Sequence, residues 1–127
     1  MLTLQSAMNA KVDPNWIAYR YPYMRAVVIE AAEAIEHHGW KWWKKQEKDL
    51  PQLQMELIDI WHFLLSQILL NERGSETAAL LKLNEQLENI EDSNQVDFDG
   101  KSYNLSTMDM LEQIELLIGI SAARRIE

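Results

Sequence analysis

Four carboxylates stand in two pairs that share one spacing along the chain. Glu30 and Glu33 form the first pair, and Glu56 and Asp59 form the second. Because residues three apart lie on the same face of an α-helix, each pair would present two carboxylates side by side. Ligands that are all oxygen favour Mg²⁺ or Mn²⁺ over zinc. We therefore predict that Glu30, Glu33, Glu56 and Asp59 bind Mg²⁺, with Mn²⁺ as the alternative.

The second pair lies on a segment that is otherwise apolar. Leu53, Ile60 and Phe63 fall on the same side as the two acids, and leucine, isoleucine and Trp61 fill most of the remaining surface. A helix that is apolar nearly all round is expected to be buried, and we interpret Trp61 as a core residue. Carboxylates inside such a helix are costly unless a cation meets them.

Two simpler interpretations compete with a metal site. A single E-x-x-E pair on a helix is usually a solvated face, and we interpret Glu36 in this way. Buried acids can also be neutralised by lysine or arginine. Two such pairs on the core side of successive helices are much less common, and they favour the metal.

A loop rich in tryptophan and lysine separates the two pairs. It contains Trp40, Lys41, Trp42, Trp43, Lys44, Lys45 and Lys48. Lysine ammonium groups suit phosphate oxygens, and indole rings offer stacking faces for a base or sugar. The alternative is that the tryptophans are core anchors or dimer contacts and that the lysines only increase solubility. Beside bound metal, the loop predicts a triphosphate site.

Helical spacing and capping residues divide the rest of the chain into about five helices. We expect helices over residues 3–11, 22–38, 49–71, 76–90 and from Ser106 or Thr107 to about 123. Gly39 belongs at a helix C-terminus, Asp49 and Ser75 begin helices, and residues 91–105 form a loop. No segment shows a strand pattern. The sequence predicts one all-α domain, a helical bundle over residues 1–127.

Composition limits the classes of partner and location. The net charge of −8 and the absence of cysteine argue against general nucleic-acid binding and against disulfides or thiolate metal sites. The most apolar stretch, residues 57–70, is too short to span a bilayer and contains Asp59 and His62. The N-terminus lacks the pattern of a signal peptide. We expect a cytoplasmic protein that binds neither nucleic acid nor membrane.

These motifs resemble those of a known enzyme superfamily. The E-x-x-E and E-x-x-D pairs are similar to those of the all-α nucleoside triphosphate pyrophosphatases, which include MazG-like enzymes. Residues 30–33, 38–45 and 56–63, with Gln5 and Asn9, resemble more specifically the dimeric, all-α dUTPases. The resemblance is strong over about residues 1–70. The second half lacks the family's further motif of Lys, Asn and Arg, and the chain looks like a compact member.

The resemblance implies hydrolysis of dUTP to dUMP and pyrophosphate with Mg²⁺. Glu30, Glu33, Glu56 and Asp59 would be the metal ligands, and Glu33 and Glu56 the catalytic residues, with Glu33 as the base for the attacking water. The expected nucleotide contacts are Gln5, Asn9, Lys41, Trp42, Trp43, Lys44 and Lys45. The amides of Gln5 and Asn9, one helical turn apart, could pair with N3–H and O4 of uracil.

Two other functions stay open at this point. One is a broader pyrophosphatase that acts on dCTP or modified nucleotides. The other is a non-catalytic helical interaction module in which the four acids are structural. Because two long core helices leave much apolar surface in a chain of this size, and because the resemblance implies a dimer, we expect a homodimer or a higher even oligomer.

Overall fold

The computed structural model describes residues 1–90 and 93–126. Its elements are α1 (Leu2–Val12), α2 (Trp16–Tyr19), α3 (Tyr23–His38), α4 (Leu50–Asn71), α5 (Glu76–Glu88), β1 (Gln95–Phe98), β2 (Lys101–Asn104), the 3-10 helix η1 (Leu105–Thr107) and α6 (Met110–Ile126). Helices make up 69% of the chain, which confirms the all-α fold class. Six α-helices are described where about five were expected, because α2, a single turn, was not predicted.

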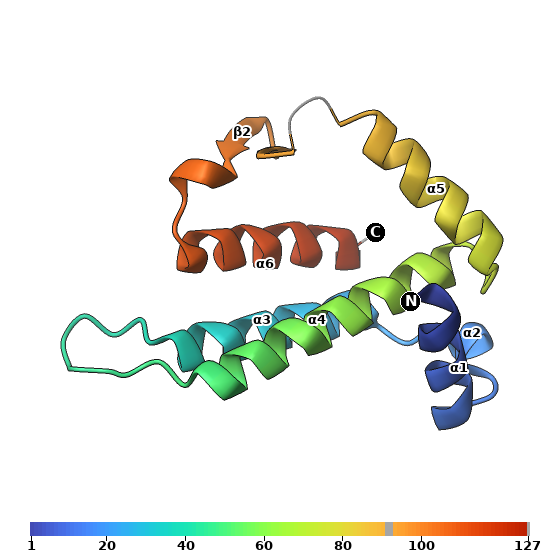
Figure 1. Ribbon diagram of the computed structural model, residues 1–127, viewed down its shortest axis with the longest axis horizontal. Coiled ribbons are helices and arrows are strands. Elements are labelled where there is room, and N and C mark those ends of the chain that lie inside the picture. Colours follow the sequence, from blue (N-terminus) through green and yellow to red (C-terminus); the bar gives the residue numbers. More distant parts are fainter. Residues whose placement is uncertain (91–92, 127) are drawn as a thin grey trace.

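Two long helices, α3 and α4, form the centre of the molecule. They lie side by side along most of their length, and α6 covers α3 (Figure 1). Ala31 and Ala34 of α3 are fully buried against Leu53 and Ile60 of α4, and Ile114 of α6 completes this cluster. Small residues on α3 let the helix backbones approach closely, which brings short side chains on the two helices within reach of each other.

Local signals set the ends of these helices as the sequence predicts. Gly39 ends α3 with a φ of 85°, a conformation that glycine adopts without steric cost. The Asp49 carboxylate accepts a hydrogen bond from Gln52 N at 3.3 Å at the start of α4. Ser75 caps α5 by accepting from Ala78 N at 3.2 Å. These caps confirm the predicted breaks at both ends of α4.

The prediction that residues 91–105 form a loop without strands is wrong for the part that the structure describes; Glu91 and Asp92 lie outside the described residues. β1 and β2 pair antiparallel, with Val96 opposite Tyr103. The turn residues Asp99 and Gly100 both have positive φ, the arrangement that an Asp-Gly hairpin turn requires. Phe98 of the hairpin packs over Gly119 of α6. The short strands were overlooked because polar residues outnumber the apolar ones.

The last helix begins later than predicted. Ser106 lies in η1, and α6 is capped by Asp109. The Asp109 carboxylate accepts from Glu112 N at 2.8 Å, and the Glu112 carboxylate accepts from Asp109 N at 3.2 Å. This reciprocal pair is a capping box, three residues further along the chain than the expected one at Ser106 and Asp109.

One face of α4 is open in the single chain, so the expectation of burial nearly all round is wrong. Trp61, predicted as a core residue, keeps 46% of its surface exposed, and Leu57 and Ile58 are also exposed. By length and composition α4 could cross a membrane, but a core helix of a soluble protein meets the same criterion. The helix also carries Glu56 and Asp59. One helix of this length and composition is weak support for a membrane span.

Candidate active site

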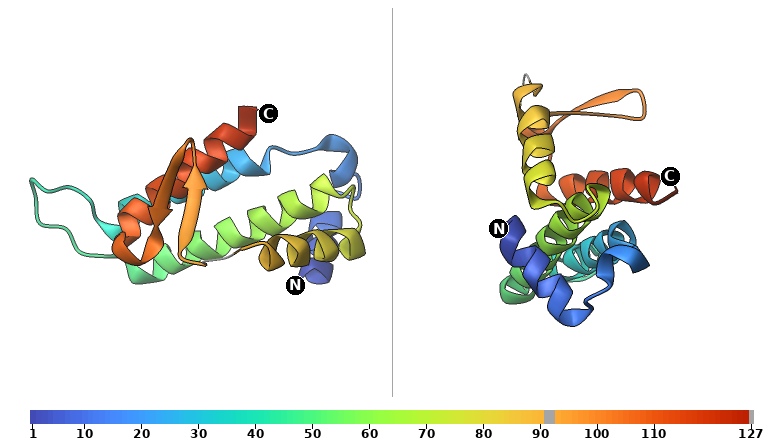
Figure 2. Two further views of the ribbon diagram at one scale, coloured as in Figure 1. Left: turned by 90° about the horizontal axis from the view of Figure 1, so that it is seen from above. Right: turned by 90° about the vertical axis from the view of Figure 1, so that its right-hand side faces the viewer.

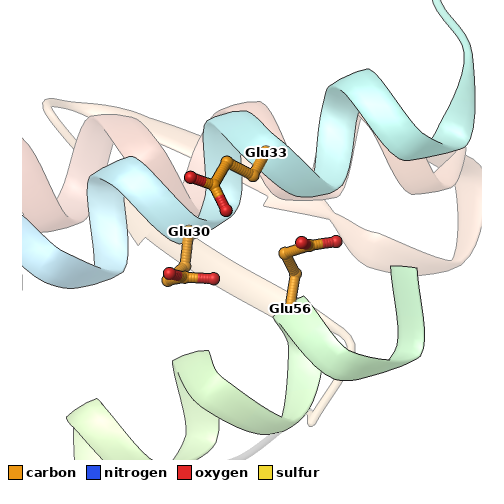
Figure 3. Close-up of side chains that lie close together, drawn as sticks. All are labelled: Glu30, Glu33 and Glu56. Carbon is orange, nitrogen blue, oxygen red and sulfur yellow. The ribbon is translucent and has the colours of Figure 1, made fainter. Parts of the chain in front are cut away.

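Three carboxylates from two helices converge between α3 and α4. Figure 3 shows Glu30 and Glu33 extending from α3 toward Glu56 on α4, and one oxygen of each lies within 4.8 Å of the others. Glu56 is buried with 5% of its surface exposed, Glu30 is half-buried and Glu33 is exposed. The cluster therefore begins in the core and opens to solvent at Glu33.

Asp59 lies one turn further along α4, beside this cluster and outside its three-carboxylate group. Its charge still acts on the group. The pKa of Glu30 is raised, first by burial and then by the negative charges of Glu33, Asp59 and Glu56. A raised carboxyl pKa means that the folded chain tolerates the ionised form poorly. The structure thus brings together three of the four predicted ligands and places the fourth next to Glu30.

His37 joins the site through Glu56. Its Nδ1 lies 2.8 Å from Glu56 Oε2, and it follows Glu33 by one helical turn. This contact holds the buried carboxylate in one orientation and leaves its other oxygen available. The sequence analysis gave His37 no role. The four-residue spacing from Glu33 was the signal that could have identified it.

The arrangement fits a divalent cation. Among the described residues, no lysine or arginine forms an ion pair with Glu30, Glu33 or Glu56. The alternative that lysine or arginine neutralises these acids therefore has no support among the described residues. The donors are carboxylate oxygens, which suit Mg²⁺ or Mn²⁺, and a bound cation would relieve the mutual repulsion that raises the pKa of Glu30.

The loop between α3 and α4 extends from the end of this helix pair (Figure 1). Trp42 is 85% exposed, and its ring meets that of Trp43 edge-on with centroids 4.6 Å apart. Trp40 Nε1 donates to Glu36 Oε1 at 2.7 Å, so Glu36, interpreted as a purely solvated residue, anchors the loop. Lys44 and Lys45 are exposed and Lys41 is half-buried. The loop presents aromatic and cationic groups together.

Gln46 holds the start of this loop in place. Its Oε1 accepts hydrogen bonds from the backbone N–H groups of Trp40, at 3.0 Å, and Lys41, at 2.6 Å. Sequence reasoning did not single out Gln46. Gln46 and Glu36 thus fix the start of the loop, while Trp42 and Trp43 remain open to solvent.

Gln5 and Asn9 lie in the contact between α1 and α4. Gln5, 6% exposed, donates from Nε2 to Asn9 Oδ1 at 2.9 Å. Asn9 Nδ2 donates to Ser66 Oγ at 2.9 Å, and Ser66 Oγ donates to the His62 carbonyl at 2.8 Å. Ser66 follows Glu56 by ten residues, about 15 Å along the helix. The two amides and the tryptophan loop therefore lie at opposite ends of the α3–α4 pair, with the carboxylates between them.

The chain was also compared with known proteins. A family model described as dUTPase matches residues 1–125, which include the β-hairpin and α6 as well as the motifs of the first half. No curated protein and no solved structure matches the chain. Since the family model covers nearly all of the 127 residues, the chain belongs to the all-α dUTPase family.

Proposed function

We propose that the chain hydrolyses dUTP to dUMP and pyrophosphate with Mg²⁺, or Mn²⁺, held by the carboxylates between α3 and α4. The observation that carries the proposal is the convergence of Glu30, Glu33 and Glu56, without a lysine or arginine paired to them among the described residues, in a member of the dUTPase family. Asp59 is the fourth proposed ligand. Glu33 and Glu56 are the proposed catalytic residues.

Different carboxylates take different roles in this proposal. When bound, the metal neutralises phosphate oxygens and lowers the pKa of a bound water. Glu56, held by His37, and the half-buried Glu30 fix the inner side of the site. Glu33 is the exposed member of the group, and we assign to it the orientation and deprotonation of the water that attacks the α-phosphate in line.

The nucleotide is proposed to lie along the α3–α4 pair. Lys41, Lys44 and Lys45 would contact phosphate oxygens, and the exposed faces of Trp42 and Trp43 would contact the sugar or base. Gln5 and Asn9, at the opposite end, would hydrogen-bond to uracil through the amide donors and acceptors that their mutual hydrogen bond does not use. Because these two regions lie far apart in one chain, one of them could complete a site on a second subunit.

Assembly into a homodimer or a higher even oligomer is part of the proposal. The open face of α4, with Leu57, Ile58 and Trp61, is the kind of apolar surface that a subunit contact buries. Leu4 and Met8 on α1 are also exposed. We further propose that the protein acts in the cytoplasm on free nucleotides and binds neither nucleic acid nor membrane.

One observation favours a second candidate, a pyrophosphatase of broader specificity that accepts dCTP or modified nucleotides. Gln5, Asn9 and Ser66 are joined by successive hydrogen bonds, so fewer of the amide donors and acceptors are available to select a base. Under this reading the two amides stabilise the contact between α1 and α4, and specificity rests on the triphosphate.

The test is pyrophosphate release from dUTP, dCTP, dTTP, dATP and dGTP, each with Mg²⁺ and with EDTA. The proposal expects rapid release from dUTP with Mg²⁺, release from the other nucleotides slower by at least about tenfold in kcat/KM, and none with EDTA. Equal rates with dUTP and dCTP would favour the broader enzyme. Absence of release from every nucleotide would contradict both.

A further inference from the structure

A polar cavity lies apart from the carboxylates, where the start of α3 meets the ends of α4 and α6. Its volume is about 440 Å³, within the range of small-molecule sites. Arg20, Arg25 and Arg124 line it, together with Tyr21 and the amides Gln67 and Asn71. None of the described residues that line it carries a carboxylate, although acidic residues outnumber basic ones by 20 to 12 in the chain.

Among the described residues, Arg20, Arg25 and Arg124 form no ion pair with a carboxylate. Three like charges around one cavity repel each other unless an anion enters it. Guanidinium groups bind phosphate oxygens through two parallel N–H donors, which makes arginine well suited to this ligand.

The other polar groups of the cavity add donors and a fixed wall. Gln67 Nε2 donates to Asn71 Oδ1 at 2.7 Å, so the Asn71 amide N–H groups remain available to a ligand. The Tyr21 hydroxyl donates to the carboxylate of Asp13, and the 41% exposed Tyr21 ring is held between Tyr19 and Tyr23. The same hydrogen bond gives the Asp13 carboxylate a partner within the chain.

This cavity is separate from the carboxylate site. Gln67 and Asn71 follow Glu56 by eleven and fifteen residues, about 17 and 22 Å along α4. Arg124 brings in the end of α6, which contributes none of Glu30, Glu33 and Glu56. From these observations we propose that the cavity formed by α3, α4 and α6 is a second binding site that holds the phosphate group of a small molecule through Arg20, Arg25 and Arg124.

Two arginines in the same backbone conformation give a matched pair of variants. Arg20 and Arg73 both have left-handed φ values, 50° and 54°, and both follow the last turn of a helix. Glycine favours this conformation, so Arg20→Gly and Arg73→Gly each remove one positive charge without straining the chain. Only Arg20 lines the cavity. Arg73→Gly is therefore the control for the change in net charge.

The experiment is isothermal titration calorimetry of the full chain with inorganic phosphate and, separately, with AMP, in buffer containing EDTA. EDTA keeps the carboxylate site free of metal, and the arginine variants show whether binding takes place in the cavity. We expect saturable 1:1 binding, weakened at least about tenfold by Arg20→Gly and by Arg124→Gln and changed less than about twofold by Arg73→Gly. Circular dichroism establishes that each variant keeps the helical content of the parent.

The outcomes decide the proposal and its ligand. Tighter binding of AMP assigns the site to a nucleotide, whereas equal binding of the two probes assigns it to the phosphate group alone, and both support the proposal. No saturable binding, equal binding by the parent and Arg20→Gly, or an equal loss with Arg73→Gly would overturn it. Because the readout is binding without metal, this result is independent of whether dUTP is hydrolysed at the carboxylates.

Discussion

The α3–α4 pair and helix α5 differ in how each buries its apolar residues. Within the pair, Val27, Ala31, Leu53 and Ile60 pack against one another inside the chain. On α5 only Ala79 is buried, and Figure 2 shows the helix projecting from the bundle.

The exposed residues of α5 show what this difference implies. Leu80 and Leu81 are exposed, and Leu87 is 64% exposed. A 13-residue helix has little stability of its own in water, so it depends on contacts that its apolar side makes with another surface. The proposed catalytic carboxylates therefore lie between two helices that pack against each other within one chain, although α4 also has an open face. Helix α5, in contrast, leaves most of its apolar residues for a contact outside the chain.

The largest expected effect is on the rate of dUTP hydrolysis when one carboxylate of the α3–α4 pair is replaced by an amide. Glu56→Gln keeps the shape of the side chain but removes a proposed metal ligand, so we expect kcat for dUTP to fall by at least about a hundredfold. The matched change Glu85→Gln, on exposed α5, should leave kcat within about twofold. Activity of Glu56→Gln within a few-fold of the parent would refute the ligand assignment.

Core truncation compares the packing of the two regions directly. Leu53→Ala in the pair should lower the free energy of unfolding by about 2–5 kcal/mol, because a fully packed side chain leaves a cavity. Leu87→Ala on α5 should cost less than about 0.5 kcal/mol in a monomer. Urea denaturation at several protein concentrations measures both. A cost for Leu87→Ala that matches Leu53→Ala and grows with protein concentration would show that a partner subunit covers α5.

Base selection is tested at the far end of the pair. If Gln5 and Asn9 read uracil, Gln5→Ala or Asn9→Ala should cost about 1–3 kcal/mol in transition-state binding, or about ten- to a hundredfold in kcat/KM for dUTP. The loss for dCTP should be smaller, because the metal and lysines bind a triphosphate common to both substrates. Equal losses for both nucleotides would assign the amides to the α1–α4 contact alone.

The smallest effect is the pH dependence of the metal-free protein. Because the pKa of Glu30 is raised in the folded chain, the folded state retains this proton at pH values where the unfolded chain has lost it. The contribution of Glu30 to the free energy of unfolding is complete below its ordinary pKa of 4.5. It is lost as the pH rises through the raised pKa of the folded chain. Glu30→Gln should remove that fall. Thermal unfolding in EDTA across this interval measures it, and parallel curves for parent and variant would contradict the prediction.

The two regions also differ in how well the sequence predicts them. The limits of α3 and α4 follow from Gly39, Asp49 and Ser75, whose effects depend on neighbouring residues only. The exposure of Trp61 could not be predicted, because a nearly uniform apolar helix does not show which side its own chain covers. The β-hairpin was missed because its Asp99-Gly100 turn stands among polar residues.

The same distinction applies to the candidate site. The three-residue spacing predicts that Glu30 and Glu33 share one helix face and that Glu56 and Asp59 share another. The structure brings Glu30, Glu33 and Glu56 together. The contact of His37 with Glu56 joins residues 19 positions apart, and it depends on the register between α3 and α4. Sequence spacing within one helix carries no information on that register.

Binding of Mn²⁺, followed by electron paramagnetic resonance with Mg²⁺ as competitor, tests the central claim most directly. We predict saturable binding to the parent, displacement by Mg²⁺, and affinity at least about tenfold weaker in Glu30→Gln and Glu56→Gln. Glu85→Gln should bind like the parent. No binding to the parent, or equal affinity in all four proteins, would contradict the claim that the carboxylates between α3 and α4 form the metal site.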